Sequence, residues 1–168
     1  MKLSIQQELP NTTLSQMTAN GPKATTLADL TNGKKVVLLG MPGAFTATCT
    51  NHHLPSLIKN STTLFNKGID EIICLVVNDI HVAKAWGDIT GAKKAGIKIF
   101  CDLESQFANA SGLSFSAPAV GFFQRLQRVL ILVDDNIIKH IQFEEARGEC
   151  KLTSGEAIVP LVDEIYDF

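Results

Sequence analysis

The chain has 168 residues, of which 45% are hydrophobic, and its formal net charge at pH 7 is -2. This length suits one domain with a sizeable core, over residues 1–168, and the charge lacks the lysine and arginine excess typical of nucleic-acid binding. No apolar run approaches the roughly 18 residues that span a membrane, and no signal peptide is evident, so we expect a cytoplasmic location.

The first 33 residues are rich in turn signals, which separate two short predicted strands at 13–17 and 24–27. We expect these two strands to form a hairpin. Continuous apolar runs follow, each typical of a strand buried on both faces of a sheet. They lie at 36–41, 72–77, 97–100 and 129–133. Alternating polar and apolar residues predict a further strand at 137–143, paired with the strand before it.

Helical patterns alternate with these strands. Residues 50–66 place apolar side chains at helical spacing, and Pro55 predicts a kink or an offset in the first turns. Further helices are predicted at 78–89, where Asn78 and Asp79 form the cap, and at 105–110 and 155–166. Residues 113–124 and 144–154 are expected to be irregular. This order predicts an α/β domain in which helices flank a central mixed β-sheet and the N-terminal hairpin is an addition.

The segment from Pro42 to Cys49 joins the first buried strand to the first long helix. A cysteine at such a junction lies where unpaired backbone N–H groups and the helix dipole favour an anion. Both features favour the thiolate, which is the nucleophilic form of cysteine. Thr46 precedes Cys49 by about one helical turn, so its hydroxyl can meet whatever the sulfur attacks. The alternative is that Cys49 is a small buried core residue.

The spacing P-x-x-x-T-x-x-C at residues 42–49 resembles the active-site signature of the peroxiredoxins. The longer string PGAFTATCTNHHLP is similar to the peroxiredoxin 5 (type II) subfamily, although Ala47 stands where the subfamily usually has proline. Strings within residues 68–86 resemble its plant and bacterial members. The resemblance implies a thioredoxin-like fold and a thiol-dependent peroxidase that reduces hydrogen peroxide and alkyl hydroperoxides in antioxidant defence and redox homeostasis.

The resemblance also has implications for cofactors, the reductant and assembly. It implies no metal, haem or flavin cofactor. It implies thioredoxin, glutaredoxin or glutathione as the reductant, and often a homodimer.

By the same resemblance, Cys49 is the peroxidatic cysteine, whose thiolate attacks the O–O bond and becomes a sulfenic acid. Arg128 directly precedes the predicted strand 129–133 and matches the active-site arginine of the family. Its guanidinium can hydrogen-bond both the sulfur and a peroxide oxygen. Thr46 would hydrogen-bond the peroxide, and Pro42 would shield the sulfur from water. We expect Arg125 to be a solvated neighbour.

The thiol that resolves the sulfenic acid is left open between three candidates. Cys74 resembles the resolving cysteine of plant type II enzymes and is preferred, although its apolar context also fits a core residue. Cys150, in a polar loop, roughly resembles the late resolving cysteine of animal peroxiredoxin 5. The third candidate is an external thiol. We expect Cys101 to be a core residue at a strand end.

Two other function classes are weighed against the peroxidase. His53 lies four residues after Cys49, and a Cys–His pair is typical of cysteine hydrolases. Hydrolases usually bring the histidine from distant sequence, so we expect His53 to be structural and His52 to lie on the surface. The remaining alternative is a non-catalytic redox sensor or signalling partner with a thioredoxin fold, whose Cys49 oxidises as a signal.

Overall fold

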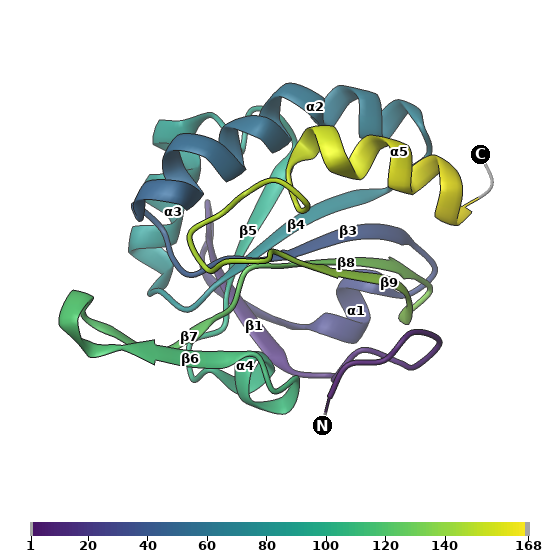
Figure 1. The fold of residues 1–168 in the computed structure, drawn as a ribbon. Helices are drawn as coiled ribbons and strands as arrows, with labels where there is room; N and C mark the ends of the chain where they lie inside the picture. The colour runs from purple at the N-terminus through teal and green to yellow at the C-terminus, as the bar shows by residue number, and fades with distance from the viewer. Residues whose placement is uncertain (1, 167–168) are drawn as a thin grey trace.

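The computed structural model describes residues 2–166, which form a seven-stranded sheet flanked by helices (Figure 1). The strand order is β2-β1-β5-β4-β3-β8-β9. The strands are β1 (Thr13–Thr18), β2 (Gly21–Thr26), β3 (Lys35–Gly40), β4 (Glu71–Val76), β5 (Ile97–Cys101), β8 (Val129–Asp134) and β9 (Ile137–Phe143). β3, β4 and β5 are parallel, whereas β8 is antiparallel to β3 and β9 to β8. The predicted mixed sheet and N-terminal hairpin are confirmed.

Helices cover both faces of this sheet (Figure 1). On one face lie α2 (Leu54–Asn66), α3 (Ile80–Thr90) and α5 (Gly155–Tyr166). On the other face lie the short helices α1 (Leu27–Thr31) and α4 (Gln106–Ala110). Within residues 2–166, no helix has the length and apolar character needed to cross a lipid bilayer.

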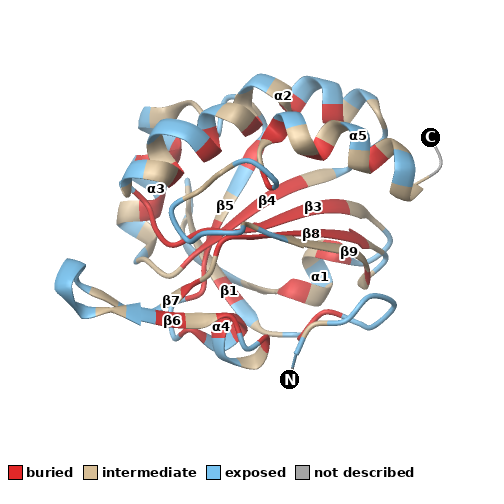
Figure 2. Ribbon diagram, in the orientation of Figure 1, coloured by how far each residue is buried: buried red, intermediate tan, exposed pale blue. Residues whose placement is uncertain are grey.

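The central strands separate two apolar cores (Figure 2). Leu39 and Cys74 pack into the core beneath α2, α3 and α5, whereas Leu38 and Ile73 pack into the core beneath α1 and α4. Successive side chains of a strand point to opposite faces, so a strand covered on both faces is apolar at every position. This arrangement explains why the sequence shows continuous apolar runs rather than alternation.

Two segments away from Cys49 differ from the sequence-based expectation. The predicted strand at 24–27 ends at Thr26, whose hydroxyl accepts from the Asp29 N–H (3.1 Å) and caps α1. Residues 113–124, predicted to be irregular, contain β6 (Ser114–Ala117), the 3-10 turn η2 (Pro118–Val120) and the start of β7 (Phe122–Leu126). Within residues 2–166, β6 and β7 pair only with each other, and they form an arm with a largely exposed tip (Figure 2). With little burial there is little hydrophobic periodicity to recognise.

The helix that follows the Pro42–Cys49 segment begins earlier than predicted. Helical backbone starts at Ala47, and Cys49–His53 form a π-helical turn, η1, that continues into α2. The Leu54 N–H donates to the Cys49 carbonyl, five residues back. Pro55 follows directly and has no N–H to donate. The offset predicted from Pro55 is therefore present as a π-helical turn.

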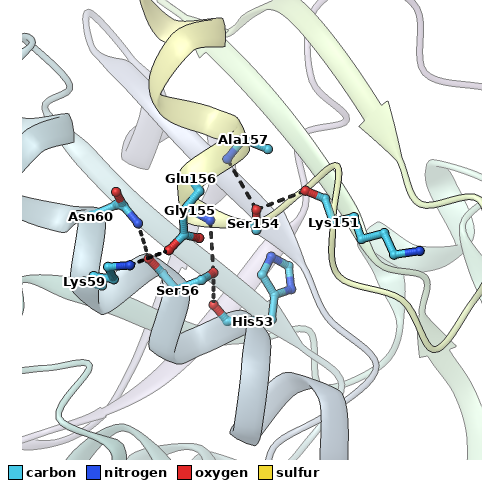
Figure 3. A network of polar contacts seen from close by, with 9 residues as sticks. All are labelled: His53, Ser56, Lys59, Asn60, Lys151, Ser154, Gly155, Glu156 and Ala157. Carbon is cyan, nitrogen blue, oxygen red and sulfur yellow. Dashed lines mark hydrogen bonds and ion pairs between the residues drawn. The ribbon is translucent and has the colours of Figure 1, made fainter.

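Gly155 allows the start of α5 to approach α2 closely. A Cβ at Gly155 would lie 2.1 Å from the backbone oxygen of Ser56, well inside van der Waals contact. The Gly155 N–H donates to Ser56 Oγ at 3.0 Å (Figure 3). The two helices are thus joined directly, at the level of the first turns of α2.

We expect Gly155→Ala to lower the free energy of unfolding by about 1–3 kcal/mol, because a backbone carbonyl cannot swing aside as a side chain can. Gly148→Ala is the matched control, since a Cβ at Gly148 meets nothing within 4 Å. Urea unfolding of both variants measures the difference. Equal loss of stability in the two variants would contradict the tight contact at Gly155.

Candidate active site around Cys49

Cys49 lies in the first turns of the helical run that follows β3. The chain leaves β3 at Gly40, passes through the loop 41–46, and becomes helical at Ala47. The Cys49 side chain is fully buried in the core beneath α2. As predicted, the sulfur is near a helix N-terminus, where unpaired N–H groups favour negative charge.

Arg128 reaches the sulfur from the neighbouring strand. It directly precedes β8, and the register pairs Gly40 of β3 with Val129 of β8. The end of β3 and the start of β8 therefore lie side by side. The Arg128 Nη2 donates to Cys49 Sγ at 3.4 Å, and Arg128 is only 5% exposed. The structure thus brings together the two residues that the sequence placed 79 positions apart.

His53 holds the other side of the same guanidinium. Its Nδ1 is 2.7 Å from Arg128 Nη1, and its Nε2 is 2.9 Å from the Thr153 backbone oxygen. Because the guanidinium can only donate and the carbonyl can only accept, Nε2 carries the hydrogen and Nδ1 accepts. Burial, and next the charge of Arg128, lower the pKa of His53 from 6.5 to about 3. His53 is therefore neutral at physiological pH.

The His53 bonds decide against a cysteine–histidine hydrolase. Nδ1 is occupied by Arg128 and Nε2 donates to Thr153, so neither nitrogen is available to take a proton from Cys49. His53 is buried as expected, but the sequence did not predict its contact with Arg128.

Pro42 and Thr46 lie in the loop before Cys49. Pro42 is buried. The Thr46 hydroxyl donates to the Gly43 carbonyl at 2.7 Å, which leaves its oxygen able to accept a hydrogen bond. Asn78, which the sequence assigned to a helix cap, instead accepts from the Ala44 N–H with its Oδ1 (2.9 Å). Asp79 alone caps α3.

The expectation that Arg125 is a solvated neighbour is wrong. Arg125 is half-buried on β7, its Nη1 donates to the Pro42 carbonyl at 3.0 Å, and its guanidinium lies 4.9 Å from the ring centroid of Phe122. The third arginine, Arg147, lies in the loop between β9 and α5, 4.3 Å from the ring centroid of Phe115 on β6. These contacts connect the arm to both loops that border Cys49.

The four cysteines are free thiols in different environments. Cys74 is fully buried in β4, and burial raises the pKa of its thiol far above the ordinary value. Cys101 is a buried residue at the end of β5, as predicted, and burial raises its pKa to about 12. Cys150 is half-buried in the loop before α5, where burial raises its pKa to about 11 although Arg128 opposes the shift.

The loop that carries Cys150 is attached to the helical turn of Cys49. The Thr48 hydroxyl donates to the Gly148 carbonyl at 3.0 Å. Thr48 directly precedes Cys49, and Gly148 is two residues before Cys150. The two cysteines are thus on segments in direct contact.

Comparison with known proteins extends these observations. The family model described as redoxin matches residues 5–158. The chain is 37% identical to the chloroplastic Peroxiredoxin-2E-2 of Oryza sativa subsp. japonica, over 94% of this chain and 71% of that protein. It is 34% identical to Peroxiredoxin-2B of Arabidopsis thaliana, over 94% of this chain and 96% of that protein.

The chain is also similar in fold to solved structures of peroxiredoxins. The crystal structure of reduced Prx3 from Vibrio vulnificus in complex with hydrogen peroxide superposes with a TM-score of 0.89 at 35% identity, covering 95% of this chain and 99% of that one. Peroxiredoxin 5 from Alvinella pompejana gives a TM-score of 0.83 at 23% identity, covering 96% of this chain and 99% of that one, a likeness of fold alone.

The neutral state of His53 predicts a pH dependence of stability. Between pH 6.5 and about 3, the unfolded chain binds a proton at His53 that the folded chain does not bind. The free energy of unfolding is therefore unaffected by this difference above the unfolded pKa of His53. It falls as the pH falls below that value, by up to about 1.4 kcal/mol per pH unit. We expect His53→Gln to flatten this loss between pH values of about 6.5 and 4. Urea unfolding across that range measures it, with the exposed His52→Gln as control. Wild-type and His53→Gln curves of equal slope would refute a neutral buried His53.

Proposed function

The chain belongs to the redoxin family and, within it, to the type II peroxiredoxins, and we propose that Cys49 is its peroxidatic cysteine. Peroxiredoxins are thiol-dependent peroxidases with a thioredoxin-like fold, so the expected fold and the expected class of oxidoreductase are confirmed. One observation carries the assignment of Cys49: its buried Sγ lies 3.4 Å from the guanidinium of Arg128.

The proposed reaction is a displacement at oxygen. The Cys49 thiolate donates an electron pair to one hydroperoxide oxygen, so the S–O bond forms as the O–O bond breaks. The sulfur is oxidised to a sulfenic acid, and the other oxygen leaves as an alkoxide or hydroxide that takes a proton. Arg128 stabilises the thiolate and the negative charge that develops on the leaving oxygen. The hydrogen peroxide bound in the similar Vibrio protein supports hydrogen peroxide as a substrate, alongside alkyl hydroperoxides.

Thr46 and Pro42 complete the proposed site. The Thr46 hydroxyl donates to Gly43, so its oxygen is oriented to accept the O–H of a bound hydroperoxide. The buried Pro42, held through its carbonyl by Arg125, excludes water from the sulfur. Water exclusion strengthens every electrostatic interaction within the site.

We propose that the sulfenic acid is resolved within the chain, by Cys74 or Cys150, releasing water as the disulfide forms. A disulfide requires Cα atoms within about 7 Å. The half-buried Cys150 is on a loop that contacts Thr48 and lines a surface pocket of about 370 Å³ with His52 and Lys59. Accessibility therefore favours Cys150, because Cys74, although in the same core as Cys49, is fully buried and would need local unwinding. An external thiol that attacks the sulfenic acid is the alternative.

The disulfide is then reduced by two electrons, and we propose thioredoxin, glutaredoxin or glutathione as their donor. A cytoplasmic location stays a prediction, since the relatives include chloroplastic and mitochondrial forms.

We also propose a homodimer. Exposed apolar side chains on segments joined by the Arg125–Pro42 bond support it: Phe45 is 51% exposed, Val120 65% and Phe123 64%. Sedimentation velocity of the wild type and of Phe123→Asp tests it, and we expect a dimer that dissociates in the variant. A monomeric wild type would refute the proposal.

The mass of the intact protein after one equivalent of peroxide tests the mechanism. We expect fully reduced wild type to lose two hydrogens rapidly, with peptide mapping locating the disulfide between Cys49 and Cys150 or Cys74. Cys49→Ser should keep the fold. It should neither lose two hydrogens nor form the disulfide, and it should lose essentially all peroxide consumption with a thiol donor.

Other outcomes discriminate between the alternatives. Gain of one oxygen at Cys49 without a disulfide would assign resolution to an external thiol. Oxidation of Cys49 without sustained peroxide consumption by any of the three donors would favour the redox sensor. Full activity of Cys49→Ser would overturn the assignment of Cys49.

A further inference from the structure

The loop between β9 and α5 is organised by a single carboxylate, Glu144. Its Oε1 accepts from the N–H groups of Lys151 (3.0 Å) and Thr153 (2.8 Å) and from the Thr153 hydroxyl (2.7 Å). Its Oε2 accepts from the Leu152 N–H (3.2 Å). Burial opposes ionisation, but the bonds from Thr153, Lys151 and Leu152 outweigh it and lower the pKa of Glu144. Three consecutive residues are thus fixed by one charged group.

The orientation of Thr153 matters because its carbonyl selects the tautomer of His53. The Thr153 side chain is fully buried, and its backbone oxygen accepts from His53 Nε2–H at 2.9 Å. With the hydrogen on Nε2, Nδ1 is left as an acceptor. A displaced carbonyl would free the ring to rotate or to change tautomer.

The acceptor on His53 in turn orients Arg128. Nη1 donates to His53 Nδ1 at 2.7 Å, and Nη2 donates to Cys49 Sγ at 3.4 Å. Arg128 Nε has no hydrogen-bond partner within residues 2–166. His53 is therefore the protein group that fixes the rotation of the guanidinium, and, being neutral, it orients the cation without cancelling its charge.

We propose that Glu144 is a positioning residue for Arg128 and acts through Thr153 and His53. This inference rests on the proposed role of Cys49. Glu144 fixes the Thr153 carbonyl, the carbonyl fixes His53, and His53 directs Nη2 of Arg128 at the sulfur. Within residues 2–166, Glu144 makes no hydrogen bond or ion pair with the sulfur or the guanidinium. Its charge favours protonation of His53, which burial and Arg128 oppose and outweigh, so the pKa of His53 stays low.

The backbone around this chain of contacts is held separately. The Ser56 hydroxyl donates to the His53 carbonyl at 2.7 Å and accepts from the Gly155 N–H at 3.0 Å (Figure 3). These bonds keep α5 and α2 together without Glu144. A change at Glu144 can therefore disturb the side chain of His53 while the helices stay packed.

The test is Glu144→Gln, with Glu145→Gln as the matched control. In either orientation of the glutamine amide, its NH2 faces a backbone N–H that the carboxylate had accepted from, so the loop loses at least one bond. Glu145 is the exposed neighbour of Glu144, and its substitution by glutamine removes the same charge. The readouts are the pH profile of Cys49 alkylation by iodoacetamide, followed by peptide mapping, and the second-order rate constant with hydrogen peroxide.

We expect Glu144→Gln to move half-maximal alkylation of Cys49 to higher pH and to slow the peroxide reaction about tenfold, less than the loss of a direct donor. Glu145→Gln should change neither. A double-mutant cycle with His53→Gln should be strongly non-additive, because both changes break the same chain of contacts. Additive effects, or an unchanged alkylation profile in Glu144→Gln, would overturn the proposal.

Two further measurements keep the result decisive. Thr153→Val removes the hydroxyl bonds to Glu144 and to Cys150 but leaves the three backbone bonds to Glu144 in place. It should therefore shift the alkylation profile of Cys49 in the same direction by less, even if Glu144→Gln fails to fold. No shift in Thr153→Val would then overturn the proposal. Wild-type peroxide consumption is measured in parallel. If the wild type were inactive, the proposed function would fail, while the alkylation profiles would still decide whether Glu144 acts on Cys49.

Discussion

A cation enclosed beside a sulfur is the interaction on which the whole site depends. Arg128 is 5% exposed, and none of the ion pairs within residues 2–166 includes it. Enclosing an unpaired charge costs several kcal/mol, unless an opposite charge compensates for it. A thiolate at Cys49, as proposed for the reaction, would supply that charge. The neutral His53 satisfies one guanidinium nitrogen without competing for the charge. The surroundings of Arg128 thus fit the anionic sulfur that the proposed peroxide reduction requires.

The sheet topology brings Cys49 and Arg128 together, because each lies close in sequence to the end of one of two neighbouring strands. β3 and β8 are antiparallel neighbours, with Gly40 opposite Val129. The loop that leaves Gly40 leads to Cys49, and Arg128 is the residue before Val129. A Cβ at Gly40 would lie 2.9 Å from Val129 Cγ1, so the two strand ends pack closely. Regular strands on either side therefore hold the proposed nucleophile and its cation in register, and the loops need only close the site around them.

The sequence could predict the parts of this arrangement that depend on local patterns. Apolar runs fixed the buried strands, and the position of Cys49 and Arg128 at element boundaries followed from them. The hydrogen bond between Arg128 and His53 joins residues 75 positions apart, and no local pattern reports it. Glu144 was missed for the same reason, because its partners are backbone amides rather than a recognisable motif. Arg125 was misassigned because nothing local indicates that β7 folds back to Pro42.

The distribution of arginine in this chain has a chemical consequence. The chain has three arginines, and each contacts a segment that borders the buried sulfur: Arg128 contacts Cys49, Arg125 contacts the Pro42 loop, and Arg147 connects the Cys150 loop to the arm. Every other basic side chain apart from the histidines is a lysine. Among the side chains, a reagent selective for guanidinium groups, such as phenylglyoxal, therefore targets this region. Its adducts would report the accessibility of the site without touching a thiol, so oxidised and reduced protein could be compared by the same label.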